Sequence, residues 1–406
     1  MARVVVVGAG QAGLAASREL TRAGVEHVVL ERGRVGATWR GRWDSFCLVT
    51  PNWSVRLPGH GYDGDDPDGY MARDEIVAYL ERYAAAVGAP VREGVAVTAI
   101  DRAGDGALAL QTSEGAMESD AVVLATGAYQ RPHRPAAAAA LPPDLLQLDV
   151  ENYRNPDALP AGPVLIVGSG QSGCQIAEEL HEAGRDVFVA CGRTPWGSRR
   201  IGDHDLIWWA LETGYLDAPV ESLPDPRARL LGNILATGHD GGHDLHLRTL
   251  HAMGVTLLGH YLGADGRRAR FAPDLAESVA WGDERHRQFM TLVRTLVAER
   301  GLTQPDVAEA APLACDAPEE LDLAGFGAVI FATGFRPDYG TWVRFPEAFD
   351  DLGFPIQADG ASTVVDGLFF VGVHFLRKRQ SSLLLGVAED AEIVARSVAT
   401  RAARAA

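Results

Sequence analysis

The sequence predicts an α/β fold built from two similar doubly wound units. Residues 4–20 read VVVVGAGQAGLAASREL, and residues 164–180 repeat this pattern 160 positions later as VLIVGSGQSGCQIAEEL. A second pair of segments, AVVLATG at 121–127 and AVIFATG at 328–334, ends in the same three residues. Each apolar run is typical of a buried parallel strand, and each G-x-G-x-x-G opens a helix. Two copies in register predict two Rossmann-type dinucleotide-binding domains.

Length and composition limit the class of protein. The 406 residues are 47% hydrophobic, which is enough for two domains with sizeable cores. The net charge of −17 argues against nucleic acid or an anionic membrane as a partner. No uninterrupted apolar run approaches ~20 residues, so we expect a cytoplasmic protein without a membrane span. None of the four cysteines forms a C-x-x-C pair, which argues against a dithiol redox centre. The sequence is compatible with a homodimer but does not decide the oligomeric state.

The two glycine-rich turns supply the groups that bind a pyrophosphate. The first glycine permits a tight turn, the second lets the phosphates approach the backbone, and the third lets the helix pack on the strand. The helix start adds free N–H groups and the positive end of the helix dipole. The candidate cofactor-binding residues are Gly8, Gly10, Gln11, Ala12 and Gly13 in the first turn and Gly168, Gly170, Gln171, Ser172 and Gly173 in the second. The ends of the paired strands add Ala125, Thr126, Gly127, Thr333 and Gly334.

The two copies differ where a ribose would lie. Glu31 ends the second strand of the first copy, and an acid there can accept hydrogen bonds from ribose hydroxyls. The same offset in the second copy falls on Cys191. Without an acid a 2′-phosphate is not repelled, and Arg193 can bind it with help from Arg199 or Arg200. The first site therefore suits FAD, and the second suits NADPH over NADH.

The order of these segments predicts a discontinuous first domain. We expect an FAD-binding domain of residues 1–160 and 325–406, with an NADPH-binding domain of residues 161–324 inserted into it. Residues 132–163 are rich in Pro and Ala and are predicted to be a linker. Residues 91–101 and 108–112 are predicted to form an antiparallel hairpin, because glycines lie between them.

Three features together resemble a known enzyme family. They are the two G-x-G-x-x-G turns, the Gly-x-Thr-Trp segment at 36–39 and the paired Ala-Thr-Gly strand ends. The chain resembles the flavin-containing monooxygenases, which are class B flavoprotein monooxygenases, and the resemblance covers nearly its whole length. The nearest subgroup is a set of small bacterial flavoproteins labelled as potassium-transport flavoproteins. The plant indole-3-pyruvate monooxygenases resemble the chain more distantly.

The resemblance implies further contacts with FAD. In this family the stretch that corresponds to residues 36–59 lines the isoalloxazine, so Thr38, Trp39 and Arg42 would border the flavin. The other implied contacts are Arg32, the backbone of Val97 at the adenine, and Ser382 and Leu383 at the flavin 2-carbonyl.

Two residues are implied at the reacting face of the flavin. The resemblance places Thr50 and Asn52 there, and Asn52 would act as a catalytic hydrogen-bond donor. The alternative for Asn52 is a turn residue that follows Pro51.

The reaction that the resemblance implies is a monooxygenation. NADPH would reduce the flavin, O2 would add to it as a C4a-(hydro)peroxyflavin, and retained NADP⁺ would stabilise this species. One oxygen atom would then enter a small organic substrate, which no motif identifies. Asp149 stands where the family usually has a histidine before Tyr153. This departure leaves an alternative open: an NAD(P)H-dependent flavin oxidoreductase (an NADPH oxidase, reductase or dehydrogenase) without oxygen insertion.

Two groups of polar residues have no place in this scheme. The first gathers histidines with aspartates, namely His239, Asp240, His243, Asp244, His246 and His251. No H-E-x-x-H motif occurs, so we expect no metal and favour a polar cluster near the interdomain cleft. The second is the basic run at 377–379, which either contacts a phosphate or lies in a solvated loop.

Overall fold

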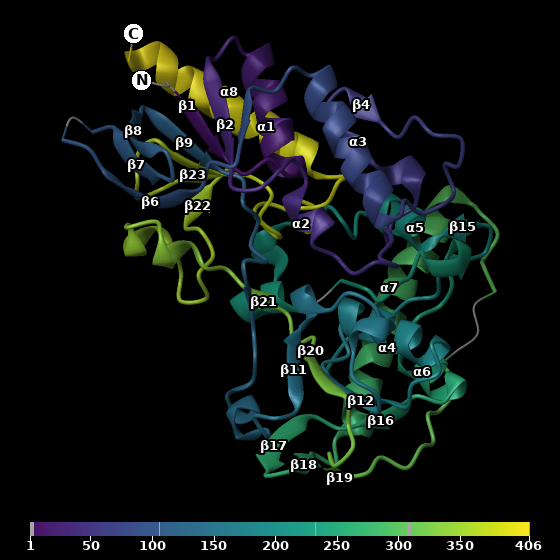
Figure 1. Cartoon of the computed structure of the whole chain (residues 1–406). Helices are drawn as coiled ribbons and strands as arrows, with labels where there is room; N and C mark the ends of the chain where they lie inside the picture. The colour runs from purple at the N-terminus through teal and green to yellow at the C-terminus, as the bar shows by residue number, and fades with distance from the viewer. Residues whose placement is uncertain (1–3, 105, 232, 307–309, 406) are drawn as a thin grey trace.

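The computed structural model describes residues 4–104, 106–231, 233–306 and 310–405, and Figure 1 shows that they form two lobes. One lobe contains both chain ends, and the other contains the middle of the chain. This arrangement confirms the predicted α/β class. The outermost residues of the predicted first domain, 1–3 and 406, lie outside the described part of the chain. No described helix is both long enough and apolar enough to cross a bilayer.

The lobe with the chain ends is centred on a seven-stranded sheet of order β22-β23-β24-β9-β1-β2-β5. β1 (Val4–Val7) pairs in parallel with β2 (His27–Glu31) and β9 (Ala121–Leu124), and all four residues of β1 are buried. Valine-rich strands suit this position, because both faces of a parallel sheet are covered. The other strands are β5 (Val91–Glu93), β24 (Leu368–Phe370), β23 (Ala361–Ser362) and β22 (Gln357–Ala358).

Helices cover one face of this sheet. α1 (Gln11–Arg22) follows β1, and α8 (Val387–Ala405) returns from the far end of the chain to lie beside it (Figure 1). Apolar residues of both helices and of α3 (Arg73–Ala86) share one core with β1. The short α2 (Ala37–Arg40) follows β2. The C-terminal helix therefore packs with α1 against the first sheet.

The opposite face of the same sheet packs against a small antiparallel sheet. Its strands are β6 (Val97–Arg102), β7 (Leu108–Thr112) and β8 (Gly115–Ser119), and their apolar side chains form a second core with β1. The predicted hairpin is confirmed for β6 and β7. It is wrong for residues 91–93, because β5 pairs in parallel with β2 at the edge of the large sheet.

The second lobe repeats this plan. Its parallel sheet has the order β11-β20-β12-β13-β16. One face packs on α4 (Gln171–Glu182) and α6 (Leu247–Met253), and the other face packs on the antiparallel strands β17, β18 and β19. The strands are β11 (Leu146–Asp149), β12 (Val164–Val167), β13 (Val187–Ala190), β16 (Thr256–Leu258), β17 (Tyr261–Asp265), β18 (Arg268–Phe271), β19 (Glu320–Asp322) and β20 (Ala328–Phe331).

The strand pairing corrects two sequence-based predictions. Residues 132–163 are not simply a linker, because β11 pairs in parallel with β20 at the edge of the second sheet. β20 in turn pairs with β12. β11 and β20 therefore belong to the second domain, although both lie outside the predicted range 161–324. Hydrogen-bond pairing between distant segments decides this boundary, and composition does not report it.

The remaining elements join or flank the two lobes. The helices are α5 (Leu206–Glu212) and the long α7 (Leu275–Arg300). The two-stranded pairs are β3 (Arg56–Leu57) with β4 (His60–Gly61), β10 (Arg131–Pro132) with β21 (Phe335–Arg336), and β14 (Arg200–Ile201) with β15 (His204–Asp205).

The two glycine-rich turns have nearly the same geometry. Gly8 and Gly168 adopt φ values of 104° and 110°, in the region that favours glycine. A Cβ on Gly13 would lie 1.8 Å from Gly8 O, and a Cβ on Gly173 would lie 2.1 Å from Gly168 O. In both copies the helix therefore touches the turn through bare backbone.

This packing predicts that two substitutions in the second turn differ strongly in their effect on stability. Gly173→Ala should reduce the free energy of unfolding by about 3 kcal/mol or more, because backbone must move to admit the methyl group. Gly170→Ala should cost less than about 1 kcal/mol, since a Cβ on Gly170 has no atom within 4 Å. Thermal unfolding of the two variants measures the difference, and equal melting temperatures would contradict the packing.

Candidate dinucleotide sites at the waist

The first turn is joined to two distant segments by one glutamine. Gln11 starts α1, whose N-terminus has no side-chain cap. Its Oε1 accepts from the indole N–H of Trp39 at 3.0 Å, and its Nε2 donates to Ser382 O at 3.1 Å. A Cβ on Gly10 would meet nothing within 4 Å, so the space in front of these N–H groups is open. The structure thus brings Gln11, Trp39 and Ser382 together at a helix start that can accept an anion.

Glu31 fixes this turn against the end of β2. Its carboxylate is 7% exposed and accepts from the backbone N–H groups of Ala9 and Gly33, each at 2.8 Å. A carboxylate has about four acceptor positions. Glu31 therefore keeps capacity for the ribose hydroxyls that the sequence assigns to it.

Two stacked rings lie at the carboxyl edge of the first sheet, one after β9 and one after β24. The ring of His374 stacks on that of Tyr129, with centroids 4.9 Å apart and planes 11° apart. Tyr129 keeps 52% of its surface accessible, and the protein around it raises the pKa of its phenol. Burial lowers the pKa of His374 to about 4, so its imidazole is neutral at pH 7. Tyr129 is absent from the sequence-based predictions, although its place two residues after Gly127 was a usable signal.

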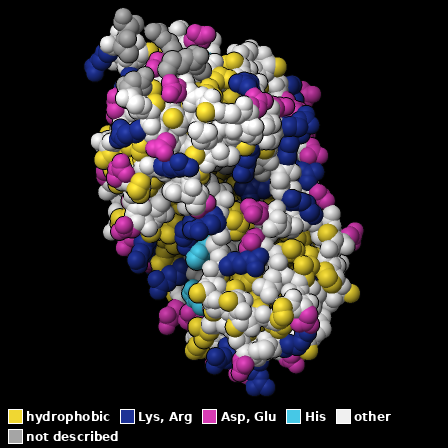
Figure 2. Space-filling model, turned by 60° about the vertical axis from the view of Figure 1, so that its left-hand side comes forward, with side chains coloured by type: hydrophobic (Ala, Val, Ile, Leu, Met, Phe, Trp, Pro, Cys, Tyr) yellow, Lys and Arg dark blue, Asp and Glu magenta, His cyan; other side chains and the backbone are white. Residues whose placement is uncertain are grey.

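Arg42 contributes an unpaired cation near Tyr129. Its buried Nε has no hydrogen-bond partner among the described residues, and its guanidinium lies 5.7 Å from the ring centre of Phe46. Burial lowers the pKa of Arg42, while the nearby Tyr129 and Glu151 act against this shift. Figure 2 shows Lys and Arg side chains gathered around the hollowed waist between the lobes. An orphaned guanidinium such as that of Arg42 fits a site for an anionic or strongly polar ligand.

Asn52 has a structural role that the sequence offered only as an alternative. The side chain is 4% exposed, its Nδ2 donates to Asp66 O at 2.9 Å, and its Oδ1 accepts from Met71 N at 2.7 Å. It therefore shapes the loop that leads into α3. Thr50 is half-buried two residues before it.

The second turn has a glutamine at the same position as the first, but it lacks the acidic residue that the first turn contacts. Gln171 pairs with both backbone groups of Ala236, and its Oε1 accepts from Ala236 N at 3.1 Å. Where Glu31 accepts from backbone N–H groups in the first copy, the hydroxyl of Ser169 accepts from Gly192 N at 3.0 Å in the second. Arg193 is exposed and forms no ion pair with the described residues. Cys191 stands at the position of Glu31 in this copy, so the acid of the first site is missing there.

The other predicted cofactor residues are placed as follows. Thr333 donates its hydroxyl to His133 O, and Thr126 accepts from Gln130 Nε2 at 2.9 Å. Val97 lies at the start of β6 and is half-buried. Exposed residues are Arg32, Thr38, Thr126 and Gly334; half-buried residues are Gly127, Ser172 and Leu383; and buried residues are Ala12 and Ala125.

Arg199 does not fit the predicted phosphate role. The side chain is 2% exposed, and its Nε and Nη2 donate to Asp205 Oδ2 at 2.9 and 2.6 Å. Its Nη1 donates to Val49 O at 2.8 Å, and its guanidinium lies 5.0 Å from the ring centre of Tyr70. Its charge is paired with Asp205 inside the second domain, and only the bond to Val49 O and the contact with Tyr70 reach the first domain. A phosphate would have to break this buried pair, so Arg199 is excluded from the NADPH site.

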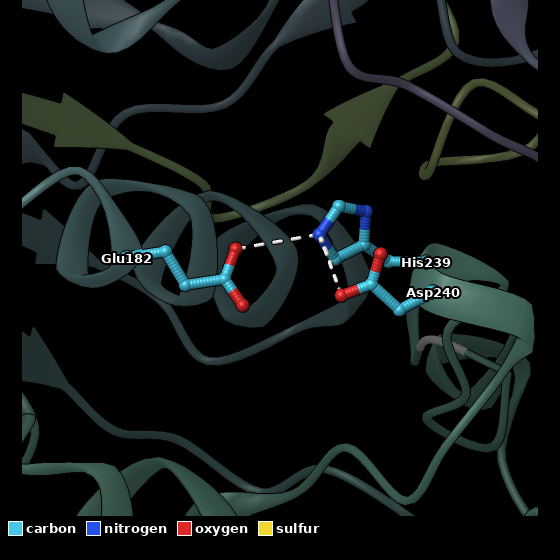
Figure 3. Close-up of side chains that lie close together, drawn as sticks. All are labelled: Glu182, His239 and Asp240. Atoms are coloured by element: carbon cyan, nitrogen blue, oxygen red, sulfur yellow. Dashed lines mark ion pairs between the residues drawn. The ribbon is translucent and has the colours of Figure 1, made fainter.

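The histidine group does not form one cluster. His239 lies 3.3 Å from Glu182 and 3.8 Å from Asp240, measured from its Nε2 to a carboxylate oxygen, on the surface at the end of α4 (Figure 3). His243 instead contacts Glu178, and His246 caps α6. The geometry of Figure 3 is that of an exposed ion-pair network.

Asp149, at the end of β11, is paired. Its two oxygens accept from Arg134 Nε and Nη2 at 2.6 and 3.0 Å. The family histidine is thus replaced by a carboxylate whose charge is neutralised by a bidentate partner.

Comparisons with known proteins agree with this architecture. A family model for pyridine nucleotide-disulphide oxidoreductases matches residues 5–206. A CzcO-like oxidoreductase of Geobacillus kaustophilus is 30% identical over 96% of each chain. The chain belongs to the CzcO-like oxidoreductase family. It is therefore an oxidoreductase.

Solved structures support the same fold. A flavin-containing monooxygenase of Stenotrophomonas maltophilia matches with a TM-score of 0.69 and 21% identity, over 100% of this chain and 99% of that chain. OTEMO, solved as a complex with FAD and NADP, matches with a TM-score of 0.58 and 15% identity, over 100% of this chain and 86% of that chain. The α/β class and the resemblance to flavin-containing monooxygenases are confirmed.

The buried Arg199–Asp205 pair predicts a stability effect without a change of coenzyme preference. Arg199→Ala should reduce the free energy of unfolding by about 3–5 kcal/mol, because it leaves Asp205 buried and unpaired. Chemical denaturation measures this loss. Arg200→Ala is the control, since Arg200 is exposed and should change stability by less than about 0.5 kcal/mol. An Arg199→Ala variant that stays stable but loses its preference for NADPH would contradict the assignment.

Proposed function

We propose that this oxidoreductase is an FAD- and NADPH-dependent monooxygenase that inserts one oxygen atom of O2 into a small organic substrate. The observation that carries the proposal is the pair of open helix starts with unlike partners, Glu31 in one and Arg193 in the other. The matches to flavin-containing monooxygenases, and to a structure that holds FAD and NADP, support it. A cytoplasmic location would give such an enzyme access to NADPH.

FAD would occupy the first turn and the open space beside it. Gly10 leaves room for the pyrophosphate, and Glu31 would accept from the ribose. Trp39 and Ser382, which Gln11 joins, would border the flavin with Arg42. The full proposed set is Gly8, Gly10, Gln11, Ala12, Gly13, Glu31, Arg32, Thr38, Trp39, Arg42, Thr50, Val97, Ala125, Thr126, Gly127, Ser382 and Leu383.

NADPH would occupy the second turn. Gly170 gives the open approach, and the exposed Arg193 would bind the 2′-phosphate. The full proposed set is Gly168, Gly170, Gln171, Ser172, Gly173, Arg193, Thr333 and Gly334.

The protein would supply position, charge and exclusion of water. Bound FAD would take a hydride from NADPH and pass the electrons to O2. The neutral ring of His374 and the stacked Tyr129 would form an uncharged wall beside the flavin. Arg42 would place a positive charge near it. Asn52 would hold the loop that faces the reaction, and the second hydrogen on its Nδ2 is its one means of donating directly to a bound group.

The first turn predicts a colourless variant. Gly10→Val should fold but lose FAD, because the side chain enters space that the protein leaves open and the pyrophosphate needs. The flavin absorbance of the purified protein, relative to its protein absorbance, measures retention. Gly104→Val is a matched control, since a Cβ on Gly104 also meets nothing within 4 Å. A yellow Gly10→Val protein would contradict the first site.

The second turn predicts a selective loss of NADPH affinity. Arg193→Ala should raise the KM for NADPH about 10- to 100-fold, as expected for about 1.5–3 kcal/mol of charge-assisted hydrogen bonding. The KM for NADH should change little, because NADH has no 2′-phosphate. Arg268→Ala, another exposed arginine of this lobe, serves as the control. Equal effects of Arg193→Ala on both coenzymes would refute the role.

Oxygen insertion needs its own test. Turnover with NADPH under ¹⁸O2, in the presence of a thioether, a tertiary amine or a cyclic ketone, should give a product that carries one ¹⁸O atom. Recovery of all consumed O2 as hydrogen peroxide, with every class of substrate, would favour the oxidase or reductase alternative.

A further inference from the structure

Three consecutive basic residues follow β24, and two of them are fully paired. Arg377 Nε lies 2.9 Å from Asp359, and Lys378 Nζ lies 2.8 Å from Glu389. Further carboxylates also contact this pair: Glu389 and Asp390 at Arg377, and Asp217 at Lys378. These two side chains are ordinary structural cations.

Arg379 is different. Its guanidinium lies between two aromatic rings, 4.2 Å from the centre of Tyr215 and 4.8 Å from that of Phe375. Its Nε is buried without a hydrogen-bond partner, and the guanidinium forms no ion pair with any described residue. The chain has 54 acidic residues, so a shortage of carboxylates does not explain why Arg379 lacks an ion-pair partner. Arg379 is half-buried, and a partly desolvated cation without an anion is unfavourable, so burial lowers the pKa of Arg379.

The backbone places Arg379 between the lobes. Arg379 N donates to Ala218 O at 3.0 Å, and Gln380 N donates to Leu216 O at 3.2 Å. Three residues further on, Ser382 O receives the bond from Gln11 at the start of α1. Arg379 is therefore anchored to the second domain on one side and lies a few residues from the first turn on the other.

Apolar residues and a second arginine lie near Arg379, while the carboxylate of Asp217 is bonded to the neighbouring Lys378 and Gln380. Tyr215, Val49 and Leu383 are partly buried and pack against the same core, and the ring of Tyr215 lies 5.3 Å from that of Phe289. Val49 directly precedes Thr50, and Leu383 directly follows Ser382, so both flank residues of the proposed FAD site. Arg285, whose buried Nε also lacks a partner, is close enough to oppose the rise in the pKa of Tyr215 that burial causes. Apolar walls with an unpaired cation suit a ligand that has an apolar body and an anionic end.

We propose that Arg379 binds the carboxylate of the organic substrate, so that the substrates of this enzyme are amphipathic carboxylic acids. The identification of the bound acid as a substrate rests on the proposed function, whereas the anion site itself does not depend on it. A guanidinium recognises oxyanions in general, so the phosphate of a nucleotide is the other source of the same chemistry. The apolar walls favour the carboxylate.

The test uses benzoate as the probe and benzamide as its neutral isostere. Titration calorimetry on the oxidised holoprotein should detect benzoate and show at least about tenfold weaker binding of benzamide. Arg379→Met keeps an unbranched side chain between the two rings and should weaken benzoate binding at least about tenfold. Lys378→Met removes a neighbouring cation that is already paired, and it should leave benzoate binding within about twofold of the wild type.

Three outcomes would overturn the proposal. The first is that benzoate and benzamide bind equally well. The second is that wild type and Arg379→Met bind benzoate equally well. The third is that Arg379→Met changes the KM for NADPH or the flavin content but not the binding of benzoate. The last outcome would assign Arg379 to a nucleotide phosphate. Arg379→Lys serves if the Met variant does not fold, because a point charge should retain part of the affinity. None of these titrations needs turnover, so a failure of the monooxygenase assignment would be seen separately, in the ¹⁸O2 experiment.

Discussion

The close approach of a helix to the turn before it is the constraint on which the rest of this structure depends. A methyl group at Gly13 or Gly173 would lie only 1.8 or 2.1 Å from a carbonyl oxygen, far closer than van der Waals contact allows. Only bare backbone allows α1 and α4 to begin where they do. That position points the first N–H groups of each helix into open space beside Gly10 or Gly170. The repeat continues outward, because each parallel sheet has helices on one face and a three-stranded antiparallel sheet on the other.

Function arises from the places where the two copies differ. Glu31 accepts from the backbone of the first turn, whereas in the second turn the neutral hydroxyl of Ser169 accepts from Gly192 N. The lobes are then joined by polar contacts that no single domain would contain. Arg199 reaches from the second domain to Val49 O in the first, and Glu179 on α4 bonds both Ser45 and Tyr153. These contacts fix the segment of residues 45–52 against the second domain, next to the proposed flavin site.

The sequence predicted what local patterns determine. The twin turns depend on short motifs, and motifs carry their own backbone geometry. The domain bounds and the assignment of Glu31 and Arg193 to different cofactors stay predictions. The sequence failed where distant partners decide. Residues 146–149 form a strand only because β20 lies beside them. Arg199 is turned away from solvent by Asp205, and Asn52 is occupied by the backbone of Asp66 and Met71. A one-dimensional pattern lacks these partners, and so it could not separate the exposed Arg193 from the buried Arg199.

The central claim is that the two turns bind different cofactors that react with each other. Anaerobic mixing of the flavin-loaded protein with NADPH, followed by absorbance, tests it most directly when wild type is compared with Gly170→Val. NADPH should bleach the wild-type flavin, whereas Gly170→Val should remain yellow and not be bleached, because only its second site is blocked. Bleaching of Gly170→Val at the wild-type rate, or loss of flavin from this variant, would contradict the claim.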